Sequence, residues 1–421
     1  PQHARRAFWN CRLPSRRVWL LISGLLAVLF PDVLSTGCII ISTNHLPEGE
    51  MTDKLSRLLE LMRQHDFDAA AINPGPNFTY LTGMRMHLME RPTVLLVARS
   101  GLAALVLPQL EQLQLTHARI ELSSFPYPDN PATWQEAFSN AFNALGIRQA
   151  RVAVEPRTLR LLELDFLQSA APDCGFINGS AVFESLRLRK EADELEKMRQ
   201  AARVAEIALQ ETLKTVRPGQ TEKQIAAELV IALFRAGSDI ELPFQPIVSS
   251  GENSANPHAS PGKRVLRAGD LLLFDWGASV DGYFSDITRT FTVGVAPKQL
   301  LQIGAVVQAA NAAGRAAARP NQLASAVDRA AREVINSAGF GEYFTHRTGH
   351  GLGIEAHEAP YIRGDNDTLL EPGMVFTVEP GIYLPGLGGV RIEDDLVICD
   401  EGAYSLTNLP REVLPYDYQQ N

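Results

Sequence analysis

The sequence predicts an α+β fold in two domains, and three features indicate it. The length of 421 residues matches two domains of ordinary size. Hydrophobic residues make up 45% of the chain and charged residues 21%, which is typical of a globular protein with a sizeable core. Short apolar runs alternate with helix-like segments in the first half, whereas in the second half grouped strands are separated by long helices.

The first domain is predicted over residues 51–185 as an α/β unit. It begins with an amphipathic helix in which Leu55, Leu58, Leu59 and Met62 share one face. A second helix is expected at residues 134–145. Apolar runs predict strands at residues 69–72, 93–97, 102–107 and 151–154.

The second domain is predicted over residues 186–421 and begins with a long charged helix from Lys190. Thr221 and Gln224 form a capping box for the next helix. Alanine-rich helices are expected at residues 298–318 and 323–338. Strands are expected at residues 271–275, 288–293, 375–379 and 390–398. The lack of regular βαβ alternation favours α+β over a doubly wound sheet.

Charge and cysteine content limit the partners and the compartment. The formal net charge of −9 argues against nucleic acid as the main partner, because phosphate binding needs a basic surface. The four cysteines form neither a disulfide framework nor a C-x-x-C metal site. We therefore expect a reducing, cytoplasmic location.

Residues 1–50 differ in character from the rest. Several arginines precede an apolar run from Val18 to Leu29, as in a secretory signal or a membrane anchor. Pro31 and Asp32 weaken a single spanning helix, and the sequence resembles a folded domain only from Met51 onward. Two interpretations stay open: a non-native extension, or an export or anchor signal that would change the location.

Two acidic residues lie at the ends of neighbouring predicted strands. Asp275 ends one apolar strand, and Asp286 lies eleven residues later beside the next. A hairpin would bring the carboxylates together, where they repel each other unless a cation or a proton lies between them. The alternative is that both are turn residues near glycines.

Three of the nine histidines, His346, His350 and His357, lie within twelve residues. Glycines on both sides of His350 allow the backbone to approach a ligand. The spacing is not the helical H-E-x-x-H of zinc proteases, because His357-Glu358 has no second histidine at the required distance. Such clustering favours a functional role over a structural one.

Two glutamates repeat the acidic pattern near the C-terminus. Glu379 ends an apolar strand, and Glu393 lies fourteen residues later in another apolar stretch. Buried unpaired glutamates are costly and need a metal or another cation. Arg391 offers the simpler alternative of a salt bridge.

Together these segments supply four carboxylates and one imidazole. Such hard, oxygen-rich donors suit two divalent ions, Mn²⁺ first and Co²⁺, Fe²⁺ or Zn²⁺ next. Carboxylates can bridge ions roughly 3.5–4 Å apart and hold a hydroxide between them, and the ions lower the pKa of that water and polarise a carbonyl. The sequence thus predicts a dinuclear site formed by Asp275, Asp286, His350, Glu379 and Glu393.

The order and spacing of these five residues resemble those of the pita-bread metallopeptidases, which include methionine aminopeptidase, proline aminopeptidase and prolidase. The resemblance covers about residues 190–415. It implies a pita-bread (creatinase/aminopeptidase) catalytic domain preceded by a smaller creatinase-type N-terminal domain. The segment from Gly381 to Arg391 is most similar to the proline-specific branch, whose substrates contain an imide bond with no N–H and a fixed ring.

The resemblance implies hydrolysis of the bond between an N-terminal residue and proline, by an Xaa-Pro dipeptidase or an Xaa-Pro aminopeptidase. Asp275 would bind one metal, Asp286 and Glu393 would bridge both, and His350 and Glu379 would bind the second. Small peptides with proline at the second position would be the substrates. A homodimer is also implied, because in relatives the N-terminal domain packs against the catalytic domain of a second subunit.

The resemblance further implies roles in catalysis and substrate binding. Glu379 would act as general base and then as proton donor. His357 would stabilise the tetrahedral oxyanion, and His258 would contact the substrate or shuttle protons. Substrate contacts are implied for His258, His357, Arg391 and Tyr383.

Two alternatives share the implied fold: a metal-free creatinase-like hydrolase and a non-catalytic binding protein. Each should lack one or more of the five ligands, so the complete set favours a metallopeptidase. A serine or cysteine peptidase is disfavoured, because there is no G-x-S-x-G motif and no well-placed nucleophilic cysteine.

Overall fold

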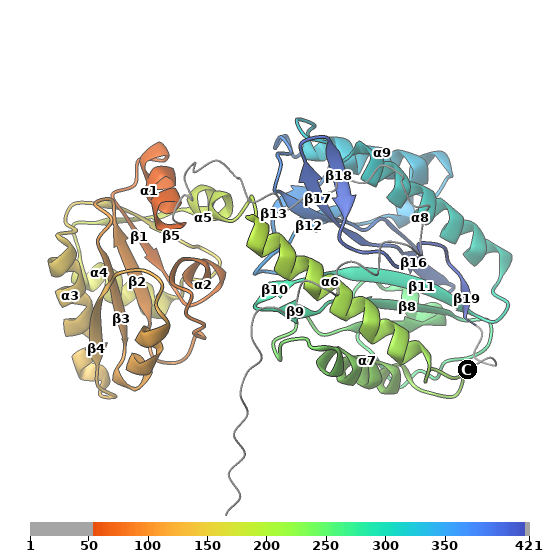
Figure 1. Cartoon of the computed structure of the whole chain (residues 1–421), viewed down its shortest axis with the longest axis horizontal. Helices are drawn as coiled ribbons and strands as arrows, with labels where there is room; N and C mark the ends of the chain where they lie inside the picture. The colour runs from red at the N-terminus through yellow and green to blue at the C-terminus, as the bar shows by residue number, and fades with distance from the viewer. Residues whose placement is uncertain (1–53, 417–421) are drawn as a thin grey trace, which may run out of the picture. The chain divides into compact units, whose positions relative to one another are not determined.

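The computed structural model describes residues 54–416 (Figure 1). The two interpretations of residues 1–50 therefore concern a segment outside the described residues. Within residues 54–416, no helix is both long and apolar enough to cross a membrane.

The N-terminal part is built around a six-stranded sheet in the order β4-β3-β2-β1-β5-β6. The sheet is mixed: β1 is parallel to β5 and antiparallel to β2, and β3 is parallel to β4. Its strands are β1 (Ala69–Ile72), β2 (Val94–Ala98), β3 (Ala103–Pro108), β4 (Ser123–Tyr127), β5 (Arg151–Val154) and β6 (Gly175–Asn178).

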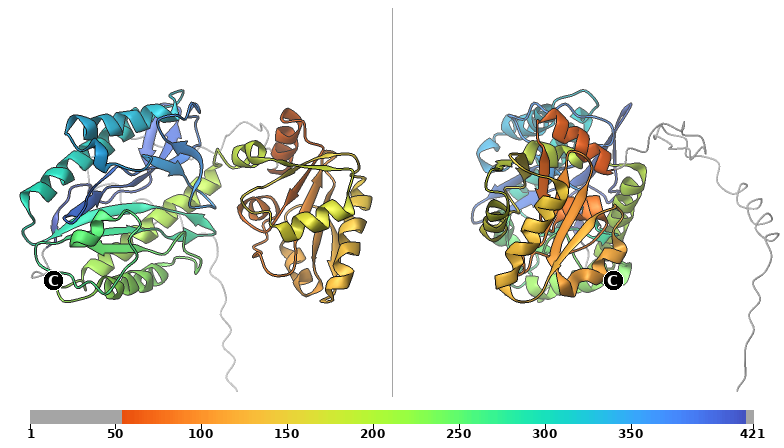
Figure 2. Two further views of the ribbon diagram at one scale, coloured as in Figure 1. Left: turned by 180° about the vertical axis from the view of Figure 1, so that it is seen from behind. Right: turned by 90° about the vertical axis from the view of Figure 1, so that its left-hand side faces the viewer.

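Helices cover both faces of this sheet, as Figure 2 shows. Alternate residues of β1 explain why: Ala69 and Ala71 pack into one core and Ala70 and Ile72 into the other. The first core is closed by α3 (Trp134–Leu145) and α4 (Leu161–Ala170), and the second by α1 (Lys54–Gln64), α2 (Pro76–Thr82) and α5 (Ser180–Leu186). A strand buried on both faces reads as a continuous apolar run, which is the pattern seen in the sequence.

The C-terminal part contains two helix pairs with strands between them (Figure 1). The pair α6 (Ala192–Leu213) and α7 (Glu222–Ala236) shares a core with β8 (Leu271–Trp276). The pair α8 (Lys298–Ala317) and α9 (Ala324–Ser337) packs on three strands, β14 (Val375–Val378), β15 (Gly381–Leu384) and β16 (Gly388–Arg391). Capping boxes begin α6 at Glu191 and α7 at Thr221, and the second confirms the predicted Thr221–Gln224 pair.

Two sheets and two hairpins form the centre of this part. The four-stranded sheet has the order β19-β11-β8-β7, and the five-stranded sheet the order β13-β12-β14-β17-β18. The first sheet comprises β7 (Ile247–Ser250), β8 (Leu271–Trp276), β11 (Ile287–Val293) and β19 (Pro415–Tyr416). The second comprises β12 (Gly349–Gly351), β13 (Glu358–Ile362), β14 (Val375–Val378), β17 (Asp394–Cys399) and β18 (Gly402–Ser405). The hairpins are β9 (Ser279–Val280) with β10 (Tyr283–Phe284), and β15 (Gly381–Leu384) with β16 (Gly388–Arg391).

One predicted strand is wrong. Residues 390–398 do not form a continuous strand, because β16 ends at Arg391 and β17 begins at Asp394 in a different sheet. Between them, Glu393 makes an isolated bridge to Thr288 of β11. This crossing connects the two sheets at the position of a predicted metal ligand.

Candidate metal centre

A tight hairpin brings Asp275 and Asp286 together. Asp275 lies on β8, and the chain returns through β9, a two-residue turn and β10 to Asp286 at the start of β11. The turn is Asp281-Gly282, with φ of 51° and 79°, which is the pairing that a hairpin with two left-handed turn residues prefers. In the register of β8 and β11, Asp275 lies opposite Thr288. Asp275 is therefore held on a strand and Asp286 directly before one, outside the Asp281-Gly282 turn, so the turn-residue interpretation is wrong.

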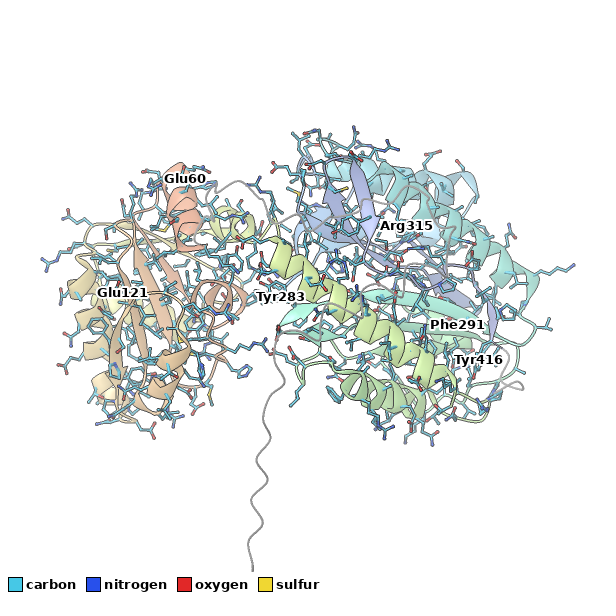
Figure 3. The ribbon with its side chains drawn as sticks, viewed as in Figure 1. Glu60, Glu121, Tyr283, Phe291, Arg315 and Tyr416 are labelled. Atoms are coloured by element: carbon cyan, nitrogen blue, oxygen red, sulfur yellow. The ribbon has the colours of Figure 1, made fainter. Side chains whose placement is uncertain are left out.

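A contact with helix α6 also fixes the position of the β9–β10 hairpin. Tyr283 of β10, labelled in Figure 3, donates a hydrogen bond from its hydroxyl to Glu194 of α6 at 2.5 Å. Both side chains are buried, so this contact ties the turn between the two aspartates to the long helix.

His350 lies in the middle of β12, between two glycines. A Cβ at Gly349 would lie 1.8 Å from the Thr377 carbonyl oxygen, and one at Gly351 would lie 2.1 Å from the Ala359 carbonyl oxygen. Only glycine permits this close packing of β12 between β13 and β14. The packing directs the His350 ring towards Glu379, which follows β14 directly.

The surroundings of His350 suit a neutral ligand. Its Nδ1 lies 3.1 Å from the Gly351 carbonyl oxygen, so Nδ1 is placed to donate, which leaves Nε2 with a free lone pair. Nε2 lies 3.3 Å from Glu379 Oε1 and 3.7 Å from Asp286 Oδ2. Burial, and then repulsion from His357, hold the pKa of His350 well below its usual value.

The structure brings all five predicted ligands together. Three overlapping groups each have ligand atoms within 4.8 Å of one another. The groups are Asp275, Asp286 and Glu393; His350, Glu379 and Glu393; and Asp286, His350 and His357. Three residues, Asp286, His350 and Glu393, each belong to two groups. The two acids among them are the residues that the sequence predicts to bridge both ions.

The acids of this cluster lack sufficient positive charge. Burial first, and then the neighbouring carboxylates, raise the pKa of Asp286 and of Glu393 well above their usual values. Burial raises the pKa of Glu379 to about 7. The buried Oδ1 atoms of Asp275 and Asp286 have no hydrogen-bond partner in the described part of the chain. Such oxygen donors fit divalent cations, which would relieve the repulsion.

Comparison with known proteins identifies the family. The chain matches the model of metallopeptidase family M24 over residues 196–400 and that of the creatinase/prolidase N-terminal domain over residues 54–189. It is 33% identical over 360 residues to an Xaa-Pro dipeptidase of Lactobacillus helveticus, covering 85% of this chain and 98% of the relative. The chain belongs to metallopeptidase family M24.

Solved structures confirm the predicted fold class, a pita-bread domain preceded by a creatinase-type domain. A dipeptidase from Pyrococcus horikoshii OT3 superposes with a TM-score of 0.81 at 39% identity, covering 86% of this chain and 99% of that one. A prolidase from Thermococcus sibiricus gives a TM-score of 0.81 at 33% identity, covering 87% and 100%. The resemblance to the proline-specific branch is thereby confirmed.

In this M24 family member, the five predicted ligands line a cavity of about 560 Å³. His258, His357 and Arg391, which the sequence predicts to bind substrate, also line it. His346, the third of the clustered histidines, lines it too. The other lining residues were not predicted from the sequence: Phe244, Gln245, Ile247, Pro257 and Arg347. Ile247 lies there because β7 pairs with β8 in a register that places it opposite Asp275. The sequence signal for this strand is weak, because only two of its four residues are apolar.

Arg391 connects a metal ligand to the cavity wall. Its Nη2 donates to Asp275 Oδ2 and its Nη1 to the Tyr383 hydroxyl at 2.8 Å. Arg391 therefore forms a salt bridge, but within residues 54–416 its partner is Asp275 rather than Glu379 or Glu393, the glutamates for which it was the alternative. Tyr383 lies behind it, 5% exposed, with its hydroxyl 2.9 Å from His346 Nε2. A substrate contact for Tyr383 stays a prediction.

The two predicted catalytic histidines face the same cavity. The ring of His357 packs edge-on against that of His350 with centroids 4.0 Å apart. Burial, and then Arg347, lower the pKa of His357. His258 is exposed and lies in the loop after the short helix η3 (Gly251–Ala255). Both imidazoles can thus reach a substrate bound beside the five ligands.

Proposed function

We propose that this protein hydrolyses the peptide bond between an N-terminal residue and proline, using two divalent metal ions. The observation that carries the proposal is the cluster of four carboxylates and one imidazole, largely buried, that lines a cavity of about 560 Å³. A buried cluster with raised carboxylate pKa values at the base of a cavity is typical of a functional site rather than a structural one.

The residues present fit two ions. Asp275 would bind one, Asp286 and Glu393 would bind both, and His350 and Glu379 would bind the other. Mn²⁺ is the preferred candidate, because hard oxygen donors dominate the set. When bound, such ions lower the pKa of water and polarise a carbonyl group.

Glu379 is the residue best suited to move the proton. Its carboxylate lines the cavity beside the other candidate ligands, where it would take up a proton from the attacking water and return it to the leaving proline nitrogen. Thr377 Oγ1 lies 3.4 Å from Glu379 Oε1 and limits the rotation of the carboxylate. His357, whose ring packs edge-on against that of His350, would donate to the oxyanion.

The cavity wall supports a proline-containing substrate. Phe244, Ile247 and Pro257 offer apolar surface for a pyrrolidine ring. Arg347, stacked on the Tyr361 ring at 4.7 Å, places a positive charge in the same cavity. In an Xaa-Pro dipeptide, the free carboxylate of the proline would pair with this guanidinium, which supports a dipeptide substrate. The relative from Lactobacillus helveticus, which is named an Xaa-Pro dipeptidase, supports the same substrate. The homodimer predicted from the resemblance stays part of the proposal.

The test is hydrolysis of Xaa-Pro dipeptides and Xaa-Pro-Xaa tripeptides after chelation, with and without added Mn²⁺. We expect metal-dependent release of the N-terminal residue, faster from the dipeptides. If neither substrate is cleaved with Mn²⁺, the proposal fails, and a binding protein of the same fold becomes the better interpretation. Cleavage that survives chelation would instead support a metal-free hydrolase.

A further inference from the structure

A buried ion cluster lies beside the loop that carries His357. Arg187, between α5 and α6, donates from Nη1 to Glu358 Oε2 and from Nη2 to Glu355 Oε2 at 3.0 Å. Lys190 donates from Nζ to Glu358 Oε1 at 2.6 Å. We name these four residues, Arg187, Lys190, Glu355 and Glu358, the Arg187 cluster.

The cations of the Arg187 cluster are anchored on the sheet that carries the metal ligands. The Lys190 backbone N–H donates to the Gly373 carbonyl at 2.8 Å, and Arg189 makes an isolated bridge to Met374. These residues directly precede β14, and β14 leads to Glu379. The two cations therefore have a fixed position relative to the metal centre.

The two glutamates of the Arg187 cluster lie on either side of His357 along the chain. Glu355 precedes His357 by two residues and Glu358 follows it directly. Glu358 also begins β13 and lies opposite Gly351 of β12, next to His350. A Cβ at Gly353 would lie 2.9 Å from Glu358 Oε1, so the loop packs closely on this carboxylate. Arg187 thus holds both sides of the His357 loop.

The His357 ring has little else to hold it. Within residues 54–416, the structure gives this ring no hydrogen bond, and its close ring contact is the edge-on packing with His350. The position of the imidazole therefore depends on the backbone that carries it. Displacement of a catalytic group by about 1 Å costs roughly 100-fold in rate, so a fixed backbone matters here.

Stability alone does not explain the Arg187 cluster. Arg187, Lys190 and Glu358 are 8%, 7% and 6% exposed, and burying such ions offsets most of the gain from pairing them. Apolar side chains of similar volume would serve a purely structural role at least as well. A positioning role accounts for the retention of charge at this place.

We propose that Arg187 and Lys190 are positioning residues, which hold the His357 imidazole in the cavity by binding Glu355 and Glu358. The inference rests on the proposed role of His357 in peptide hydrolysis. The four side chains of the Arg187 cluster do not touch substrate; they act through the backbone of residues 355–358.

The test is a double-mutant cycle in the full chain, with Glu358→Gln, His357→Ala and both together. Glutamine keeps the shape of the side chain while removing the charge that binds both cations. We expect Glu358→Gln to lower kcat about 10-fold with KM for an Xaa-Pro dipeptide nearly unchanged. In the His357→Ala background, the same change should lower kcat by less than about 2-fold. Arg187→Lys should retain more activity than Arg187→Met.

Glu371→Gln is the matched control. Glu371 pairs with Arg189, the residue between the two cations, but this pair is about half exposed and does not reach the His357 loop. We expect Glu371→Gln to leave kcat unchanged.

A second readout does not depend on activity. The imidazole proton signals of the metal-free protein are recorded by NMR, and the His357 signal is assigned from its loss in His357→Ala. We expect this signal to shift or broaden in Glu358→Gln and to stay in place in Glu371→Gln. An unmoved signal, or equal kcat losses in both backgrounds of the cycle, would overturn the inference. If the wild-type protein cleaves no Xaa-Pro peptide, the proposed function fails, and the NMR signal still decides the positioning role.

Discussion

Two adjacent acids, Glu393 and Asp394, lie in opposite electrostatic surroundings. Both are at most 1% exposed. Asp394 accepts hydrogen bonds from Arg289, Arg411, Asn311 and Thr407, each between 2.8 and 3.0 Å. Burial alone would raise the pKa of Asp394, but Arg289 and Arg411 hold it below its usual value. Asp394 is therefore a satisfied, structural carboxylate.

Glu393 has the reverse balance. Its carboxylate accepts one hydrogen bond, from Thr288 at 2.6 Å, and faces Glu379 and Asp275. Burial and these neighbours raise its pKa well above the usual value. The difference teaches that burial of an acid is not itself a sign of function. What distinguishes the proposed metal centre is a group of buried acids without enough cations.

Among substitutions that test this contrast, Asp286→Asn should have the largest effect, on activity and on Mn²⁺ binding. Loss of the acid shared by two ligand groups should lower kcat/KM for an Xaa-Pro dipeptide at least about 1000-fold and weaken Mn²⁺ binding. The metal-free variant should unfold at a higher temperature than the wild type, because one repelling charge is gone. Enzyme assays, calorimetric Mn²⁺ titration and thermal unfolding in EDTA measure these effects.

Asp400→Asn removes an exposed acid just after β17 and is the matched control for Asp286→Asn. Full Mn²⁺-dependent activity in Asp286→Asn would contradict the metal assignment.

Asp394→Asn should act on stability instead. Removing this charge leaves Arg289 and Arg411 partly unpaired in a buried place, which should cost about 3–5 kcal/mol in the free energy of unfolding. Urea unfolding of the metal-free protein measures the loss. If the free energy of unfolding falls by less than about 1 kcal/mol, Asp394 is not the structural carboxylate that its contacts indicate.

In the metal-free protein, the pH dependence of the free energy of unfolding should reflect the raised pKa of Glu379. In the metal-free fold, burial raises the pKa of Glu379 from 4.5 to about 7. The folded state therefore holds this proton more tightly than the unfolded chain, so the contribution is fully present below pH 4.5 and is lost as the pH rises through about 7. On the order of 2–3 kcal/mol should be lost.

Urea unfolding in EDTA between pH 4.5 and 8 checks this expectation. Glu379→Gln should flatten the profile over the same range. A wild-type free energy of unfolding that rises with pH would contradict the assignment of the raised pKa to Glu379.

Arg347→Met should give the smallest effect, on substrate choice. If Arg347 binds the free carboxylate of a dipeptide, kcat/KM for Xaa-Pro should fall about 10-fold, or ~1.4 kcal/mol, relative to Xaa-Pro-Xaa. Arg363→Met, which removes an exposed arginine paired with Asp365, is the control. If kcat/KM falls equally for Xaa-Pro and Xaa-Pro-Xaa, Arg347 does not bind the free carboxylate of a dipeptide.

The five candidate ligands were recognisable in the sequence from local patterns, and their role as metal ligands stays a prediction. His350 lies between glycines, and the four acids lie within or beside apolar strand residues: Asp275, Asp286, Glu379 and Glu393. The longer helices of both parts were likewise predictable from apolar periodicity and from the Thr221–Gln224 box, whereas the shorter helices α2, α4 and α5 were not expected. The break between β16 and β17 was not, because Arg391-Ile392-Glu393 continues an apolar stretch and only the bridge to Thr288 diverts the chain.

Long-range pairs lay beyond the reach of the sequence. Arg187 and Glu358 are 171 positions apart, and nothing in the local pattern of either residue names its partner. The cavity wall from Phe244 to Ile247 was missed for a related reason, since its place depends on the register of a four-residue strand with β8. Motifs report chemistry at single positions, whereas walls and ion clusters depend on the packed fold.

The most direct test of the central claim is a calorimetric titration of the chelated wild-type protein with Mn²⁺, with Xaa-Pro hydrolysis measured at each step. The account predicts two ions bound per chain, hydrolysis that appears as they bind, and loss of both in Asp286→Asn. Binding of no Mn²⁺, or hydrolysis that is independent of it, would contradict the account.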